Sequence, residues 1–177
     1  MKHIILLTAF IFMGYAPNVL YDFKPDCSLS DWKILDDTVM GGRSSGNFSI
    51  TKNGTGLFDG SVSLENNGGF SSVRHRVKDI SLVDFSSFVL KVKGDGKSYQ
   101  FRVKDDVNSY YSYKKDFSTS GEWQEIQLKF SDFTPTYRGR KLDIPNFSGT
   151  SLEEMTFLIA NKENEIFRLE LDVLSVK

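Results

Sequence analysis

Acidic residues beside glycine-rich turns are the first candidates for chemistry in this chain. Asp36 and Asp37 precede the turn MGGRSSG, and Glu65 opens the turn ENNGGF. Two carboxylates that face each other across a cleft can act as the acid and the nucleophile of a glycosidase. Acidic residues at turns more commonly accept hydrogen bonds from nearby backbone N–H groups and fix the loop. We therefore expect these acids to shape the turns.

Histidine and cysteine are too scarce for a zinc centre. Beyond residues 1–16 only His75 and Cys27 are available, whereas zinc needs several such ligands at regular spacing. A Ser-His-Asp arrangement would combine His75 with, for example, Ser71 and Asp79, and no nucleophile-elbow motif is present. The sequence thus predicts no catalytic residue, no cofactor and no metal site.

Two weaker binding chemistries stay open at the same turns. Calcium could use the oxygen atoms of four acids, although the sequence has no EF-hand loop; they are Asp36, Asp37, Asp59 and Glu65. The glycine pairs Gly41-Gly42 and Gly68-Gly69 could cradle an anion through backbone N–H groups. The glycine spacing of phosphate loops and dinucleotide sites is absent, so tight turns between strands are the favoured interpretation.

The turns also carry a family resemblance. DDTVMGGRSSG, followed by GLFDGSVSLENNGGFSSVR, resembles the signature of the complex I intermediate-associated protein family, and GEWQEIQLKFSDFTPTYRGR extends the match. This resemblance implies a galactose-binding-like β-sandwich without established catalysis, related to assembly factors of respiratory complex I. It singles out the signature residues as functional candidates: Asp36, Asp37, Met40, Arg43, Glu65, Asn67 and Phe70.

The elements that must position these turns are β-strands. Phe58, Val62 and Leu64 alternate with polar residues, which is typical of a strand with one face in the core. Similar patterns predict about ten short strands, and the fold class is all-β: an antiparallel β-sandwich of the jelly-roll, galactose-binding-like type. Between the strands, we expect a long loop over 131–145 and a helical turn starting at Ser151–Glu154.

Composition supports one packed domain. The chain has 177 residues, 40% of them hydrophobic and 14% aromatic, and we expect a single β-sandwich domain over residues 17–177. The formal net charge of −1 gives no basic surplus for a phosphate backbone, so a nucleic-acid partner is not expected.

The N-terminus resembles a secretory signal peptide. Lys2 and His3 precede the apolar run 4–13 and a small-x-small site at 14–16, which predicts a cleaved leader over residues 1–16. The apolar run 4–13 is too short to cross a bilayer as a permanent helix, and no stable membrane span is expected once the leader is removed. The chain has a single cysteine, so it can form no internal disulfide. An exported protein without disulfides is compatible with a bacterial periplasm, which is therefore the expected location. An uncleaved leader would instead leave the chain cytoplasmic or membrane-associated.

Aromatic and basic residues predict a binding face. Arg102 and Lys104 project from the polar side of one strand, and other strands could bring further candidates onto the same sheet: Arg74, Arg76, Tyr110, Tyr111, Tyr113 and Trp123. Aromatic rings with planar polar groups suit either sugar stacking or a protein contact. Arg138, in the loop 131–145, completes the candidate set. A solvated sheet face without function is the alternative.

Three functions follow in order of preference. The first is a non-enzymatic module that binds a protein partner, resembling a complex I assembly factor or chaperone. The second is a carbohydrate-binding β-sandwich, which predicts aromatic rings beside Asp, Asn and Arg in one groove. The third is a glycan-acting hydrolase, which requires two unengaged carboxylates in a cleft.

Overall fold

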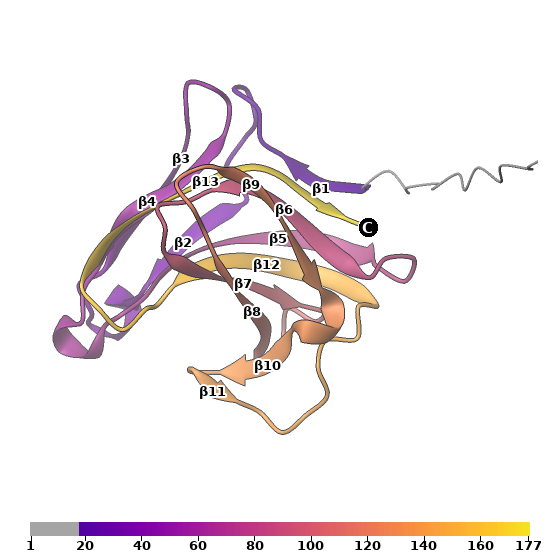
Figure 1. Ribbon diagram of the computed structural model, residues 1–177. Coiled ribbons are helices and arrows are strands. Elements are labelled where there is room, and N and C mark those ends of the chain that lie inside the picture. Colours follow the sequence, from indigo (N-terminus) through magenta and orange to yellow (C-terminus); the bar gives the residue numbers. More distant parts are fainter. Residues whose placement is uncertain (1–17) are drawn as a thin grey trace, which may run out of the picture.

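The computed structural model describes residues 18–177, which form a sandwich of two antiparallel sheets (Figure 1). The predicted leader over residues 1–16 lies outside the described residues. No helix in the described part of the chain is long and apolar enough to cross a membrane.

The six-stranded sheet is built around the long strand β13. Its strands follow the order β3 (Ser45–Ile50), β4 (Gly56–Val62), β13 (Glu165–Val176), β6 (Ser87–Lys93) and β9 (Trp123–Lys129). β1 (Asn18–Asp22) pairs with the C-terminal end of β13. The pairing of β13 with β6 shifts register between Leu171 and Val173, which marks a β-bulge or local irregularity in this strand.

The seven-stranded sheet carries most of the candidate binding residues. Its strands follow the order β11 (Arg140–Lys141), β10 (Thr134–Tyr137), β8 (Ser112–Ser118), β7 (Ser98–Lys104), β12 (Ser151–Ile159), β5 (Ser71–Ser81) and β2 (Trp32–Asp36). Three short 3₁₀ helices connect the strands of the sandwich: η1 (Asp37–Met40), η2 (Glu65–Asn67) and η3 (Phe130–Asp132).

Phenylalanine fills the space between the sheets. The rings of Phe58 and Phe167 lie 4.7 Å apart within the six-stranded sheet, and Phe88 of that sheet meets Phe101 of the other at 5.3 Å. All four side chains are fully buried, because alternate residues of each strand face the same side. On β9 the exposed Trp123 lies on the opposite face from the buried Leu128.

Two sequence-based expectations about the elements are wrong. The segment Ser151–Glu154 does not form a helical turn, because it is the first part of β12, where Ser151 and Leu152 pair with β5. The region 131–145 is not one long loop, since it contains part of η3 and the short hairpin of β10 and β11.

Candidate functional site

Asp37 ties the two glycine-rich turns together. This fully buried residue accepts hydrogen bonds from the backbone N–H of Ser44 (3.0 Å), Gly69 (2.6 Å) and Phe70 (3.2 Å), and from the Ser44 hydroxyl (2.5 Å). Burial by itself raises the pKa of Asp37, but these hydrogen bonds outweigh it and hold the pKa below its usual value. A carboxylate with four donors has little capacity left for a substrate.

Glycine is required where the turns approach this carboxylate. A Cβ added to Gly42 would collide with the Asp37 side chain, and one added to Gly68 would lie 2.6 Å from Asp37 Oδ2. Asn66 and Asn67 adopt left-handed backbone angles, with φ of 56° and 59°, so η2 is a shaped turn. We call residues 37–44 and 64–70 together the signature rim.

The remaining acids of the turns are also engaged. Asp36 accepts from the backbone N–H of Gly46 (2.9 Å) and from the Ser71 hydroxyl (2.6 Å). Glu65 forms an ion pair with Arg43 at 2.6 Å across the rim. Arg74 and Arg102 lie on β-strands of the seven-stranded sheet, whereas Glu65 lies in η2 and pairs with Arg43 instead. These contacts argue against a glycosidase pair among the three acids.

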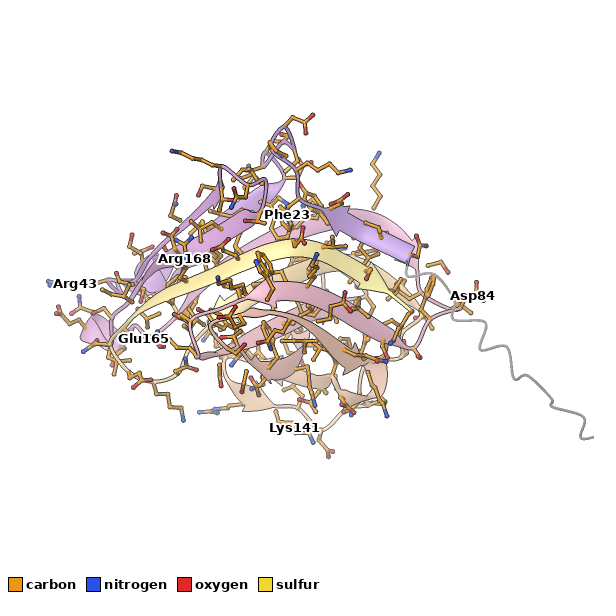
Figure 2. The ribbon with its side chains drawn as sticks, turned by 45° about the horizontal axis from the view of Figure 1, so that its top comes forward. Phe23, Arg43, Asp84, Lys141, Glu165 and Arg168 are labelled. Atoms are coloured by element: carbon orange, nitrogen blue, oxygen red, sulfur yellow. The ribbon has the colours of Figure 1, made fainter. Side chains whose placement is uncertain are left out.

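The signature rim presents apolar side chains to solvent. Val39 is 66% exposed and Met40 is 62% exposed, both in η1, and Leu64 beside η2 is also exposed. The Asn66 side chain donates to the Gly41 carbonyl (3.1 Å) and joins the two turns. Figure 2 shows Arg43 at one end of the sandwich and Asp84 at the other. The rim is therefore a rigid end surface with exposed apolar residues.

The structure brings four predicted basic residues onto the outer face of the seven-stranded sheet. Arg102 and Arg74 both pair with Thr156 of β12, and Lys104 and Arg76 both pair with Glu154, one row along. The register adds Lys114, opposite Arg102, and Lys33, opposite Arg74, neither of which the sequence pattern singles out. We call this surface the basic face; its six cations are Lys33, Arg74, Arg76, Arg102, Lys104 and Lys114.

Two of the aromatic candidates, Trp123 and Tyr113, do not share that face. Trp123 lies on β9 of the six-stranded sheet, where it borders a hollow of about 540 Å³ with Lys91 and Asp172. Tyr113 is buried between the sheets. The expectation that both line the same surface as Arg74 is therefore wrong, because strand order and register, which the sequence pattern does not specify, separate them.

A tyrosine cluster lies at the end of β8 and β10. The ring of Tyr110 is 5.3 Å from that of Tyr111 and 5.2 Å from that of Tyr137. The Arg138 guanidinium lies 5.3 Å from the centre of the Tyr137 ring. Two of the predicted site residues, Tyr111 and Arg138, thus belong to one cluster with exposed rings.

His75 is part of the core. Its ring stacks on Trp32 at 4.8 Å, and its Nδ1 atom lies 3.4 Å from the Asp31 carbonyl oxygen. Burial lowers the pKa of His75, and the contact with Asp31 opposes this shift. Ser71, the nucleophile considered with His75, instead donates to Asp36. In residues 18–177, no group of three or more His, Cys, Asp or Glu side chains could hold a metal ion.

Comparisons with known proteins place these features in a family. The model of the complex I intermediate-associated protein 30 family matches residues 21–171, which include the signature rim and both sheets. The chain belongs to this family. A mitochondrial complex I intermediate-associated protein 30 of Mus musculus is 25% identical over 90% of this chain. An uncharacterised protein of Schizosaccharomyces pombe is 31% identical over 80% of this chain and 74% of its own length.

The match covers little more than half of two of the relatives. The chain spans 56% of the mouse relative and 52% of the Drosophila melanogaster relative, which is 25% identical over 75% of this chain. The mouse and fly proteins are named as mitochondrial. The prediction of export to a bacterial periplasm is therefore wrong, because the leader-like composition of residues 1–16 does not identify the compartment of the family.

Solved structures share the fold. The family 11 carbohydrate-binding module of Clostridium thermocellum, solved with a mixed-linked tetrasaccharide, superposes with a TM-score of 0.64 over 90% of this chain and 95% of the module, at 15% identity. An exo-β-agarase matches with a TM-score of 0.57 and 13% identity over 90% of this chain and 25% of the enzyme. At such low identity these matches confirm the β-sandwich alone.

Proposed function

We propose that this chain is a non-catalytic module that holds a protein partner, in the manner of an assembly factor. The observation that carries the proposal is the signature rim. Its acids are consumed by internal hydrogen bonds and an ion pair, while Val39 and Met40 remain exposed. Methionine adapts to varied apolar surfaces, and a rigid display of apolar side chains loses little entropy on binding.

The names of the relatives indicate what kind of partner to expect. The mouse and fly proteins are named for complex I intermediates, which supports an incompletely assembled protein as the partner of this chain. Such a partner exposes apolar surface that is later covered, and the rim offers a matching apolar contact. Mechanistically, the chain would cover that surface and release it without making or breaking covalent bonds.

Affinity capture tests the rim against a matched control. Tagged wild-type chain, Val39→Asp and Val83→Asp are expressed in the host that encodes the chain, and retained proteins are quantified by mass spectrometry. Val83 is a suitable control because it is 70% exposed, and its neighbour Asp84 lies at the opposite end of the sandwich from Arg43 (Figure 2).

We expect wild type and Val83→Asp to retain the same partner protein in similar amounts. Val39→Asp should retain less of it by about tenfold or more, because an interface anchor is lost. An identical set of retained proteins for all three chains would contradict a rim contact.

Carbohydrate binding is a second candidate, supported by the tyrosine cluster. Exposed rings of Tyr110 and Tyr137 beside the Arg138 guanidinium offer stacking surfaces and hydrogen-bond donors. The family 11 module was solved with a β-1,3-1,4-linked tetrasaccharide, so mixed-linked glucan is a reasonable first probe. In affinity electrophoresis, retardation by this glucan that Tyr110→Ala abolishes would support the candidate. Unchanged mobility across a panel of neutral glycans would exclude it.

A further inference from the structure

The charge of the basic face differs from that of the chain as a whole. Within the described residues its six cations form ion pairs with two acids, Glu154 and Asp116, whereas the whole chain has a formal net charge of −1. Lys114 lies directly opposite Arg102, and Lys33 directly opposite Arg74. Like charges at directly opposite positions destabilise a sheet, so folding alone does not explain this arrangement.

The arginines of the basic face are short of acceptors. Arg102 donates from Nε (2.9 Å) and Nη2 (2.6 Å) to a single neutral oxygen of Gln100, and it forms no ion pair within the described residues. Arg74 reaches Glu154 only at 3.8 Å, and its buried Nε has no hydrogen-bond partner there. Burial lowers the pKa of Arg102, which is the mark of a guanidinium removed from water.

One carboxylate serves two arginines. Glu154, whose side chain is 6% exposed, pairs with Arg76 at 3.3 Å as well as with Arg74. Leaving a charge in a partly dry site without a counter-charge is costly, and a bidentate carboxylate from a ligand would relieve it. The guanidinium groups of Arg74 and Arg102 therefore have donor capacity that a carboxylate could use.

We propose that the basic face binds an acidic segment of a protein partner. This inference rests on the proposed function and names the chemistry of the partner. At the β2 edge a hollow of about 440 Å³ is lined by the cations Lys33, Arg74 and Arg76, by Asp31, and by the apolar residues Ile34 and Leu35. A polypeptide supplies carboxylates and aliphatic side chains together, as this lining requires.

Other anionic ligands fit less well. A planar membrane surface would meet protruding cations, but Arg102 and Arg74 are half-buried, and Thr156 between them is buried. An anionic polysaccharide carries no aliphatic side chains to fill the space beside Leu35. Both classes nevertheless serve as alternative outcomes of the test.

A labelled peptide of alternating Glu and Leu tests the face by fluorescence anisotropy, with a Gln–Leu peptide as the uncharged control. We expect the wild-type chain to bind the acidic peptide with an affinity that falls as the salt concentration rises. The Gln–Leu peptide should show no detectable binding. Arg74→Gln and Arg102→Gln should each weaken binding by about tenfold or more, since each removes a charged donor from a half-buried site.

One lysine from each sheet provides a matched pair of charge-removing variants: Lys33 is exposed and Lys93 is half-buried. Lys33→Gln removes one charge from the basic face and should weaken binding by about threefold. Lys93→Gln removes one charge from β6 of the other sheet and should leave binding unchanged. If an arginine variant fails to fold in thermal unfolding, the lysine pair still decides the outcome.

Three results would overturn the inference. The first is equal binding of the acidic peptide by the wild type and all basic-face variants, and the second is equal binding of the acidic and the Gln–Leu peptide. The third is binding of anionic lipid vesicles or of heparin that depends on the arginines, while the acidic peptide does not bind. Retention of a captured native partner by both arginine variants would also overturn it, while the proposed function would stand. If the wild type captures no partner but binds the acidic peptide through Arg102, the proposed function fails and the peptide site remains.

Discussion

Asp37 shows how one side chain can decide whether a motif performs chemistry or builds a surface. Its carboxylate is fully buried and receives four hydrogen bonds from three residues on both turns. The sequence could identify Asp37 as important, since it stands just before a glycine-rich turn. It could not identify the hydrogen-bond donors, because Gly69 and Phe70 lie more than thirty positions away and meet Asp37 only after β2 and β5 pair.

Asp37→Asn should destabilise the fold by about 3 kcal/mol, because the amide NH₂ would face N–H donors that then stay unsatisfied in a buried site. Urea unfolding measures the change, and Asp59→Asn, at a partly exposed position on β4, should stay within about 0.5 kcal/mol of wild type. Because the pKa of Asp37 is lower in the folded state, the ionised carboxylate contributes fully to the free energy of unfolding above about pH 4. This stabilisation is lost as the pH falls through the folded-state pKa. Equal losses for both variants would contradict the role of Asp37.

His75 predicts a pH dependence of stability. Burial lowers its pKa in the folded state, so the unfolded chain binds the proton more readily. The stabilisation by neutral His75 is therefore full above the unfolded value of about 6.5 and is lost as pH falls through the lower folded-state pKa. Thermal unfolding between about pH 8 and pH 5.5 should show a decline in wild type that His75→Gln lacks. Parallel pH profiles would contradict a buried neutral His75.

The elements of the sandwich follow largely from residue alternation. The alternating patterns of β4, β7 and β9 predict these strands because each has one face in the core. β10 and β11 are not predicted, since they span only four and two residues and carry no alternation. The pairing of Arg102 with Lys114 and of Arg74 with Lys33 depends on register, so the sequence pattern suggests cations but not the face they share.

The connection between β2 and β3 depends on space beside Asp37. Gly42→Ala should destabilise the fold by about 2 kcal/mol, because the new Cβ would displace the carboxylate and its donors. Gly121→Ala is the control, since no atom lies within 4 Å of a Cβ at that position. Chemical unfolding of both variants measures the difference. A Gly42→Ala chain as stable as Gly121→Ala would show that the turn can open without cost.

At the scale of the whole molecule, two surfaces are candidates for recognition. The signature rim lies at one end of the sandwich, where Figure 2 labels Arg43, and the basic face lies on the outside of strands β2, β5, β7 and β8 of the seven-stranded sheet. Both are built on strands β2 and β5, since β2 leads into η1 and β5 follows η2. A partner that contacts both would combine an apolar anchor at the rim with charge complementarity along the sheet.

The proposed division of labour predicts distinct kinetic effects. Lys33→Gln on the basic face should slow association with a captured partner by about threefold and leave dissociation almost unchanged, because exposed charges act mainly on encounter. Val39→Asp on the rim should instead accelerate dissociation by about tenfold or more. Surface plasmon resonance with the captured partner separates the two rates. The reverse assignment of rates would contradict this division.

Site-specific photo-cross-linking tests the central claim most directly. A photoreactive amino acid replaces Met40 on the signature rim or, as the control, Val83, and the chain is irradiated in its native host. The account predicts one dominant covalent adduct with a protein partner from position 40 and none from position 83. No adduct from position 40, or the same adducts from both positions, would contradict the claim that the signature rim holds a partner.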